Sequence, residues 1–416
     1  MKKIRILIWS QVCDKYLMGI LKKAADKFDI EYKDITEVGN ADYSLYFSQS
    51  GFDNILKQYY PDIIFLHDVT SRNLVIDIPE NIKVIVYCDH FHEQFTFFGK
   101  SFFDMIPKNN YILFPILDAK NVDRDGVLEN PNLKNKIFFM PFMPCLDELD
   151  AVENQSDFDT YNSDLSITLS YRGIDYYYWS FGIKSNTFAG RQLMCFLGEI
   201  VYAVRRAIRD SGAVYMKDTS IIRMITVIME QQGLSCNIRS IDEFIKYWVS
   251  AIKYSIIPTE YGNCVIDWLI ERKYDIKIYG NGWKNRKEYQ NYAFGEIPDG
   301  SMELNKAYRY SKINVGSSCA TLGIHRRVFE AMKNNCLCLQ VDTHQSWQFS
   351  DWRHYFEDGK DIVIYHDKTE LYQKIDYYLS HDEERRKVTD AAWEKLKKCP
   401  DIGELLGNII VNVYSK

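Results

Sequence analysis

The arrangement of apolar segments constrains the fold of this chain more than any other feature. Short uninterrupted apolar runs, such as 4–9, 62–66 and 83–88, alternate with stretches of helical periodicity. Strands that are apolar along their whole length are buried on both faces, which is typical of a parallel sheet with helices on both sides. The sequence therefore predicts an α/β fold built from doubly wound, Rossmann-like sheets.

Two domains of this kind are expected. The first covers residues 1–150, and an acidic, turn-rich segment over 146–163 marks its end. The second covers 160–400 and contains a mostly helical insert at about 187–257, which is either a specificity element or plain scaffold. Residues 401–416 form a last apolar helix. Within the insert, Ser240 with Glu243 three positions later is a capping-box pattern that predicts a helix start.

Composition excludes several classes of function. The net charge of −6 argues against nucleic acid as the main partner, because nucleic acid selects a basic surface. The apolar run 4–9 is too short for the core of a signal peptide, and no run approaches the roughly 20 residues of a membrane span. We therefore expect a cytoplasmic protein with reduced thiols, Cys336 and Cys338 among them as buried strand residues. The oligomeric state cannot be read from the sequence.

The segment 316–332, GSSCATLGIHRRVFEAM, is the richest in chemistry. A Gly/Ser-rich loop that contains Ser317 leaves backbone N–H groups free, and the helix that follows adds partial positive charge, so the pattern predicts an anion site. His325, Arg326 and Arg327 add donors at the same helix start. Because cations there oppose the helix dipole, a bound anion would compensate them. The alternative is an arginine paired with a surface carboxylate.

Glu330 follows one turn after Arg326 on the same helix face. A carboxylate at that position can accept hydrogen bonds from both hydroxyls of a ribose. The alternative is an ion pair with Arg326 inside the helix.

The segments GIHRRVFEAMKNNCLCLQ and FEDGKDIVIYHDKTELYQKIDYYLSHDEERRKV resemble the C-terminal half of GT-B glycosyltransferases. The resemblance is strongest to the CgeB-like, "glycosyl transferases group 1" branch, in which a stretch like IKIYGNGW comes earlier in the same order. It covers residues 258–398. It implies that the chain transfers a sugar from a nucleotide-diphosphate sugar, UDP-linked on family frequency, to a glycan or protein acceptor. It also implies a final helix that returns toward the first domain.

The resemblance assigns roles to individual residues. Glu330 matches the glutamate that holds the donor ribose, and Arg326 and Arg327 fall near the diphosphate. Gly280, Gly282 and Trp283 fall in the loop near the nucleotide base. Arg172, after the first strand of the second domain, is within reach of the diphosphate, and the aromatic cluster 176–179 beside it either stacks on a sugar or packs in the core.

Asp89 and His90 are the candidate catalytic residues in the first half of the chain. They end the run VIVYCDH, which resembles the strand that leads to an active-site histidine. Independently of any family, they follow a parallel strand at the edge where ligands bind. His90 can instead be a structural residue, and Asp89, His90, His92 and Glu93 can also be considered as metal ligands. Because His90 and His92 alternate along a strand, they point to opposite faces, which disfavours a shared metal.

Two further features bear on whether the chain uses a metal ion and whether it is catalytically active. The Asp-x-Asp strings at 123–125 and 157–159 bind divalent ions in another glycosyltransferase fold, but here they lie in acidic segments expected to be solvated loops. No cofactor or metal is expected, because arginines and a helix N-terminus can stabilise the leaving diphosphate. Leu322 stands where retaining relatives often carry a second glutamate, so a catalytically degenerate binding subunit is the alternative to an active enzyme.

Overall fold

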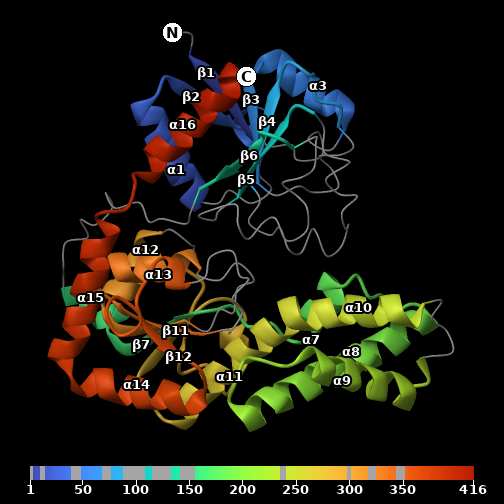
Figure 1. Cartoon of the computed structure of the whole chain (residues 1–416), viewed down its shortest axis with the longest axis vertical. Helices are drawn as coiled ribbons and strands as arrows, with labels where there is room; N and C mark the ends of the chain where they lie inside the picture. The colour runs from blue at the N-terminus through green and yellow to red at the C-terminus, as the bar shows by residue number, and fades with distance from the viewer. Residues whose placement is uncertain are drawn as a thin grey trace. The chain divides into compact units, whose positions relative to one another are not determined.

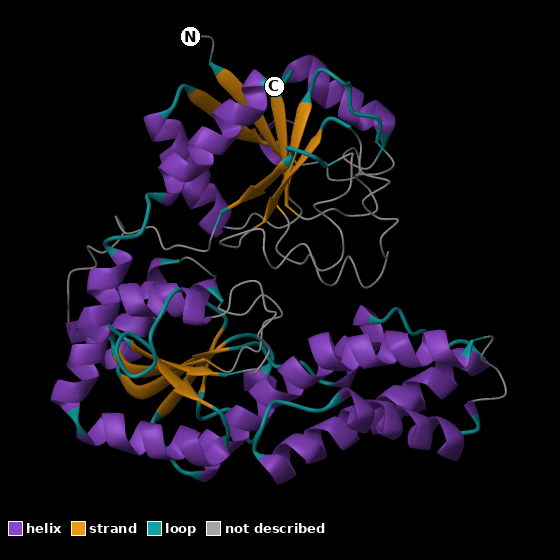
Figure 2. Cartoon of the chain, viewed as in Figure 1, coloured by secondary structure: helices purple, strands orange, loops and turns teal. Residues whose placement is uncertain are grey.

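The computed structural model describes residues 3–9, 15–38, 48–67, 76–87, 108–114, 133–140, 155–234, 240–297, 301–316, 325–342 and 352–416. The chain divides into two compact units. One comprises residues 1–148, 347–350 and 398–416, and the other 149–346 and 351–397. Each unit contains one six-stranded sheet with helices around it, as Figure 1 and Figure 2 show. The predicted α/β fold class is confirmed.

All strands of the first sheet are parallel, in the order β2-β1-β3-β4-β5-β6. The strands are β1 (Ile4–Trp9), β2 (Ile30–Asp34), β3 (Ile63–His67), β4 (Lys83–Tyr87), β5 (Asn110–Phe114) and β6 (Ile137–Phe139). The helices described with them are α1 (Lys15–Lys27), α2 (Ile35–Val38) and α3 (Gln49–Gln58). The expected apolar runs become the buried central strands, because a strand covered on both faces needs apolar side chains on both.

The C-terminal helix α16 (Ile402–Ser415) packs against α1 in this first unit (Figure 1). Lys27 at the end of α1 forms an ion pair of 2.7 Å with Asp401, which caps α16. Gly407 lies directly on the ring of Phe28. The last residues of the chain therefore complete the unit that its first residues begin.

The second sheet is also parallel throughout, in the order β12-β11-β10-β7-β8-β9. Its strands are β7 (Ser163–Thr168), β8 (Ile276–Tyr279), β9 (Ala293–Gly295), β10 (Ser311–Gly316), β11 (Leu337–Val341) and β12 (Val363–Tyr365). Its C-terminal helices are α12 (Met302–Arg309), α13 (Arg326–Lys333), α14 (Lys368–Ser380) and α15 (Asp382–Leu396). Cys336 and Cys338 are buried at β11, as expected.

Between β7 and β8 the chain forms a helical bundle that extends away from the sheet (Figure 1). Its helices are α7 (Ile174–Ser180), α8 (Phe188–Ser211), α9 (Asp218–Gln231), α10 (Ile241–Ala251) and α11 (Ile257–Glu271). Ser240 caps α10 as predicted, because its hydroxyl accepts a hydrogen bond of 3.3 Å from the Glu243 amide. The buried faces of α8 and α11 pack on each other and continue the core of the sheet.

The helical backbone does not end with α10 at Ala251. It passes through a π-helical turn, Ile252–Ile256, directly into α11. Pro258 follows closely after the π-helical turn, and because it has no N–H donor it cannot take part in a regular i→i−4 ladder there. The bundle and the sheet therefore share one continuous helical element, and a π turn of this kind is frequent at functional sites.

The acidic segment before β7 also differs from expectation. Residues Gln155–Tyr161 form helix α6 instead of a solvated loop. Gln155 hydrogen-bonds Asp159 one turn later at 2.7 Å, and Asp157 pairs with Lys306 at 3.0 Å. Local side-chain pairs and a tertiary ion pair thus stabilise a helix that composition alone does not favour.

Candidate functional site

The second sheet reverses its winding direction beside β7. The chain proceeds from β7 to β8 and β9 on one side, and then returns to place β10, β11 and β12 on the other. In open α/β sheets, ligands bind outside the carboxyl ends of the strands at such a switch point. The loops after β7 and β8 and the start of α13 lie at this edge.

Arg327 lies at the switch point itself. Its guanidinium Nη1 donates a hydrogen bond of 2.8 Å to the carbonyl oxygen of Thr168, the last residue of β7. Because α13 follows β10, this bond joins the end of β7 to the helix that comes after its neighbouring strand. A guanidinium has five N–H donors in a fixed fork, so the bond orients the group and uses one of them.

The first turn of α13 is electropositive. It carries Arg326 and Arg327 and no acidic residue. His325 is the N-cap, and its Nδ1 accepts a hydrogen bond of 3.3 Å from the Arg327 amide. A neutral imidazole that accepts at Nδ1 carries its proton on Nε2, so His325 presents a donor there. The predicted grouping of His325, Arg326 and Arg327 at one helix start is therefore present.

Glu330 lies one turn further along α13 and is only 7% exposed. Its main-chain carbonyl accepts a hydrogen bond from the Asn334 side chain at 2.8 Å. A buried carboxylate is costly unless polar groups surround it, so its environment at this position must be polar.

The loop after β8 is held tightly against the loop after β7. A Cβ atom at Gly280 would overlap the Leu169 carbonyl, and Gly282 has a left-handed φ of 86°. Trp283 begins a short 3₁₀ turn, and its indole N–H donates to the Leu169 carbonyl at 2.5 Å. Its ring is fully buried, edge-on to Tyr171 and Tyr289. Trp283 thus has no surface to offer a base and instead fixes the two loops to each other.

Arg172 is exposed on the loop after β7. Its guanidinium lies over the Tyr176 ring at 4.5 Å, and its main-chain carbonyl accepts a weak hydrogen bond of 3.4 Å from Asn263. The aromatic cluster 176–179 divides: Tyr177 is buried in the core, whereas Trp179 is 80% exposed.

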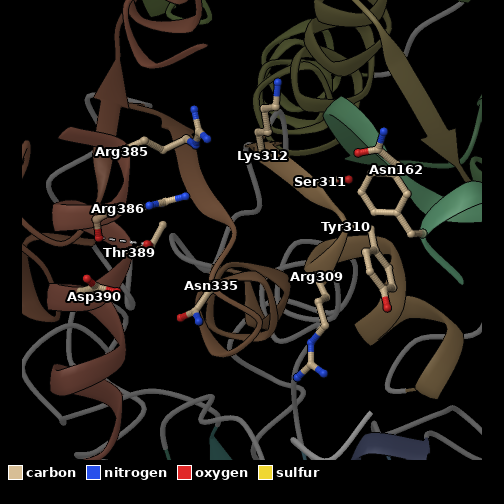
Figure 3. Close-up of a pocket in the computed structure, with 11 residues that line it drawn as sticks. Asn162, Arg309, Tyr310, Ser311, Lys312, Asn335, Arg385, Arg386, Thr389 and Asp390 are labelled. Atoms are coloured by element: carbon tan, nitrogen blue, oxygen red, sulfur yellow. Dashed lines mark hydrogen bonds between the residues drawn. The ribbon is translucent and has the colours of Figure 1, made fainter. Parts of the chain in front are cut away.

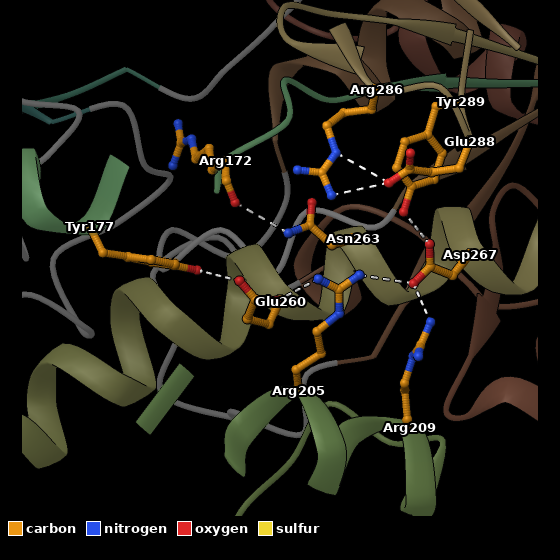
Figure 4. A network of polar contacts seen from close by, with 10 residues as sticks. All are labelled: Arg172, Tyr177, Arg205, Arg209, Glu260, Asn263, Asp267, Arg286, Glu288 and Tyr289. Carbon is orange, nitrogen blue, oxygen red and sulfur yellow. Dashed lines mark hydrogen bonds and ion pairs between the residues drawn. The ribbon is translucent and has the colours of Figure 1, made fainter. Parts of the chain in front are cut away.

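A network of charged groups links the helical bundle to these loops, and sequence reasoning missed it (Figure 4). Asp267 on α11 accepts from Arg205 at 3.0 Å and from Arg209 at 2.6 Å, both on α8. The Tyr289 hydroxyl donates to the same carboxylate at 2.5 Å. Tyr289 in turn packs on Trp283, so the network extends to the loop after β8.

Glu260 is the most deeply buried acid of this network. It accepts a hydrogen bond of 2.9 Å from the Tyr177 hydroxyl and lies 3.8 Å from Arg205. Burial raises the pKa of its carboxyl above the ordinary 4.5, although Tyr177 and Arg205 act in the opposite direction. The signal was present in the sequence, because Glu260, Asn263 and Asp267 repeat at helical spacing within an apolar run.

A second polar group that sequence reasoning missed lies after β11 and β12. Asp342 is buried, and it accepts from Arg353 at 2.5 Å and lies 3.5 Å from His366. His366 also contacts Glu370 at 2.8 Å, and this contact lowers the pKa of the Glu370 carboxyl. These residues share the carboxyl edge with Arg327, since β10, β11 and β12 are neighbours.

Asp89, His90 and Ser317 lie outside the described residues, as do Leu322 and the Asp-x-Asp string at 123–125. Their predicted roles stay predictions. Within the described ranges, no three His, Cys, Asp or Glu side chains are placed to hold one metal ion. Nor does any described helix have the length and apolarity required to cross a membrane.

Part of the chain is similar in sequence to a known protein family, and the whole chain is similar in fold to solved structures. Residues 264–401 match the family described as glycosyl transferase-like. No curated protein matches. HepE from Anabaena, solved with UDP and glucose, is 8% identical with a TM-score of 0.50 over 99% of this chain and 100% of that one. An α-glucosyltransferase, solved with UDP-glucose and DNA containing an abasic site, is 11% identical with a TM-score of 0.52 over 100% of both chains.

Identities this low establish the fold alone. The chain has the two-sheet α/β fold of GT-B glycosyltransferases, and its segment 264–401 is similar to the family described as glycosyl transferase-like. The predicted resemblance to GT-B glycosyltransferases is therefore confirmed. Its assignment to the CgeB-like branch stays a prediction.

Proposed function

We propose that this protein is a glycosyltransferase that takes a sugar from a UDP-linked donor and transfers it to a hydroxyl group of a glycan or protein acceptor. One observation carries the proposal: at the switch point of the second sheet, Arg327 is fixed on the Thr168 carbonyl beside an electropositive helix start. The solved structures of similar fold that contain UDP or UDP-glucose support a nucleotide-sugar donor.

The proposed donor site uses the residues of this edge. Arg326, Arg327, Arg172 and backbone N–H groups at Ser317 bind the diphosphate, and Glu330 binds the ribose hydroxyls. The loop held by Gly280, Gly282 and Trp283 forms the wall beside the base. The meeting of these loops at the carboxyl end of β7 supports the proposal.

The transfer itself needs little chemistry from the protein beyond charge and position. The bond between the sugar C1 and the diphosphate oxygen breaks, and its electron pair stays on that oxygen. The acceptor hydroxyl oxygen bonds to C1, and its proton passes to the departing diphosphate or to water. Arg326 and Arg327 stabilise the charge that grows on the diphosphate, so we propose that no divalent ion is required. Asp89 and His90 are proposed to contact the transferred sugar.

Slow hydrolysis of the donor tests this function without knowledge of the acceptor. Purified protein is incubated with UDP-glucose, and release of UDP and glucose is followed with and without EDTA. We expect release above the rate of a heat-denatured sample, unchanged by EDTA. Loss of activity with EDTA and its recovery with manganese would contradict metal independence.

The alternative is a degenerate subunit that binds the donor and does not cleave it, which Leu322 favours. UDP-glucose would then raise the unfolding temperature without being hydrolysed, because a ligand that binds only the native state stabilises it. We further propose that the protein acts in the cytoplasm. We also propose that it does not bind nucleic acid, because its net charge is −6 and nucleic acid selects a basic surface.

A further inference from the structure

A cavity of about 580 Å³ opens at the amino-terminal edge of the second sheet (Figure 3). Asn162, Tyr310 and Asn335 stand just before β7, β10 and β11, which are neighbouring strands. The remaining lining residues are Phe158, Arg309, Ser311, Lys312, Arg385, Arg386, Thr389 and Asp390. Its size is within the range of small-molecule sites, which is roughly 300–1,000 Å³.

This cavity is separate from the proposed donor site. β7 begins at Ser163, directly after Asn162 of the cavity lining, and ends at Thr168 at the switch point. Six residues of strand at about 3.3 Å each place the two ends roughly 17 Å apart. One ligand at the carboxyl edge therefore does not explain the polar groups at the opposite edge.

The lining is strongly cationic. Arg309, Lys312, Arg385 and Arg386 line the cavity, against one carboxylate, that of Asp390. Figure 3 shows Arg385 and Arg386 on one side and Lys312 on the other, whereas Arg309 points away from them. A lining with this charge selects an anion.

Lys312 and Arg385 are already paired, but not with lining residues. Lys312 contacts Asp164 at 2.7 Å, and Arg385 contacts Asp382 at 2.7 Å. The Lys312–Asp164 pair is exposed, and exposed pairs are weak and easily replaced by a bound anion.

Arg385 and Arg386 differ in exposure and in the contacts that their guanidinium groups make. Arg385 is anchored, since it also donates to the Tyr378 carbonyl at 2.7 Å and is only 12% exposed. Arg386 is exposed, and within the described residues its guanidinium makes no hydrogen bond or ion pair. One arginine is therefore pre-organised, and the other is available to a ligand as a bidentate donor.

The rest of the lining contains aromatic rings and amide groups, which a site for an inorganic anion alone does not need. The rings of Tyr310 and Phe158 meet edge to face at 6.0 Å, and Phe158 is 44% exposed. Asn162 and Asn335 add exposed amides. Aromatic faces with amide donors and acceptors suit a sugar ring, which has apolar C–H faces and hydroxyl edges.

We propose that this cavity binds a phosphate-bearing sugar, with Arg386 and Lys312 on the phosphate and Tyr310 beside the ring. The ligand is either a free sugar phosphate or a unit of a phosphodiester-linked glycan. This site does not depend on the donor site proposed above.

The test is calorimetric titration of the full chain with three probes: glucose 1,6-bisphosphate, yeast phosphomannan and inorganic pyrophosphate. The pocket variant is Arg386→Gln/Lys312→Gln. The matched control is Lys387→Gln/Lys397→Gln, which removes the same charge from exposed residues paired with Glu384 and Glu394. Arg327→Gln separates this cavity from the proposed donor site, where pyrophosphate and sugar phosphates can also bind.

We expect the pocket variant to weaken the binding of at least one sugar probe by about tenfold or more, as loss of a charged hydrogen bond implies. The control and Arg327→Gln should keep that affinity. Preference for the bisphosphate indicates a free sugar phosphate, and preference for phosphomannan indicates a glycan. Equal affinity for pyrophosphate would overturn recognition of the sugar. Equal losses in the pocket variant and its control would overturn the site altogether.

Discussion

Arg327 and Thr168 are joined by a hydrogen bond of 2.8 Å between the guanidinium Nη1 and the main-chain carbonyl oxygen. They are separated by 159 positions in the sequence. The bond connects the helix after β10 to the end of β7, and so fixes a cation at the place where the sheet changes its winding direction. A lysine at the same position would keep the charge but not the fork of donors.

Arg327→Lys should therefore lower kcat for donor hydrolysis by about 10- to 100-fold, which corresponds to the loss of one charged hydrogen bond. Arg223→Lys, on the exposed face of α9, is the control and should leave kcat unchanged. Steady-state kinetics with UDP-glucose gives both values. Wild-type kcat in Arg327→Lys would mean that the guanidinium does not contact the diphosphate.

Glu330→Ala should act on affinity instead. A ribose contact is made equally in the ground state and the transition state, so its loss raises KM and the dissociation constant of UDP by about 10- to 100-fold and changes kcat little. Titration calorimetry with UDP measures the affinity, and circular dichroism checks the fold. Unchanged UDP affinity in a folded variant would remove Glu330 from the donor site.

His90→Ala should show the opposite pattern. We propose that His90 contacts the transferred sugar and not the nucleotide, so kcat should fall while the UDP dissociation constant stays within about twofold, since no hydrogen bond to UDP is lost. The control is His381→Ala, because His381 is an exposed residue between α14 and α15. A loss of UDP affinity equal to that of Glu330→Ala would place His90 at the nucleotide.

The order of helices and strands could be predicted from the sequence because buried parallel strands leave an unambiguous apolar pattern. The runs around Ile63 and Val84, and the helix start at Ser240, are examples. The cluster of His325, Arg326 and Arg327 was also predictable, because it depends on local chain geometry. The partner of Arg327 was not, since no local pattern identifies a carbonyl 159 positions away.

The burial of Trp283 could not be predicted from the sequence. Its place in the loop after β8 was predicted, but its burial depends on Tyr171 and Tyr289, which come from separate segments. The pairing of Asp267 with two arginines of α8 likewise depends on how α8 and α11 pack.

Glu260 should make stability depend on pH. Its folded-state pKa is raised above 4.5, so the folded protein binds this proton more tightly than the unfolded chain does. Stability from this group is therefore greatest at low pH and falls as pH rises from about 4.5 through the folded-state pKa, by about 1.4 kcal/mol for each unit by which the pKa is raised.

Glu260→Gln keeps an acceptor for Tyr177 and removes the titration. The unfolding temperature of Glu260→Gln relative to wild type should therefore increase between pH 4 and pH 7. Glu271→Gln, an exposed residue of the same helix, is the control and should show no such trend. A constant difference across this range would show that Glu260 does not titrate there.

The docking of α16 on α1 gives a final prediction about stability. A Cβ atom at Gly407 would overlap the ring of Phe28, whereas a Cβ at Gly19, within α1, would meet no atom within 4 Å. Gly407→Ala should destabilise the first unit by about 1–3 kcal/mol, because the interface must open to admit the methyl group. Gly19→Ala should instead stabilise it by about 0.5–1 kcal/mol, because alanine is the better helix former. Urea unfolding of both variants, followed by circular dichroism, gives the two free energies. If the two substitutions shift the midpoint equally and in the same direction, then α16 does not pack on α1 through Gly407.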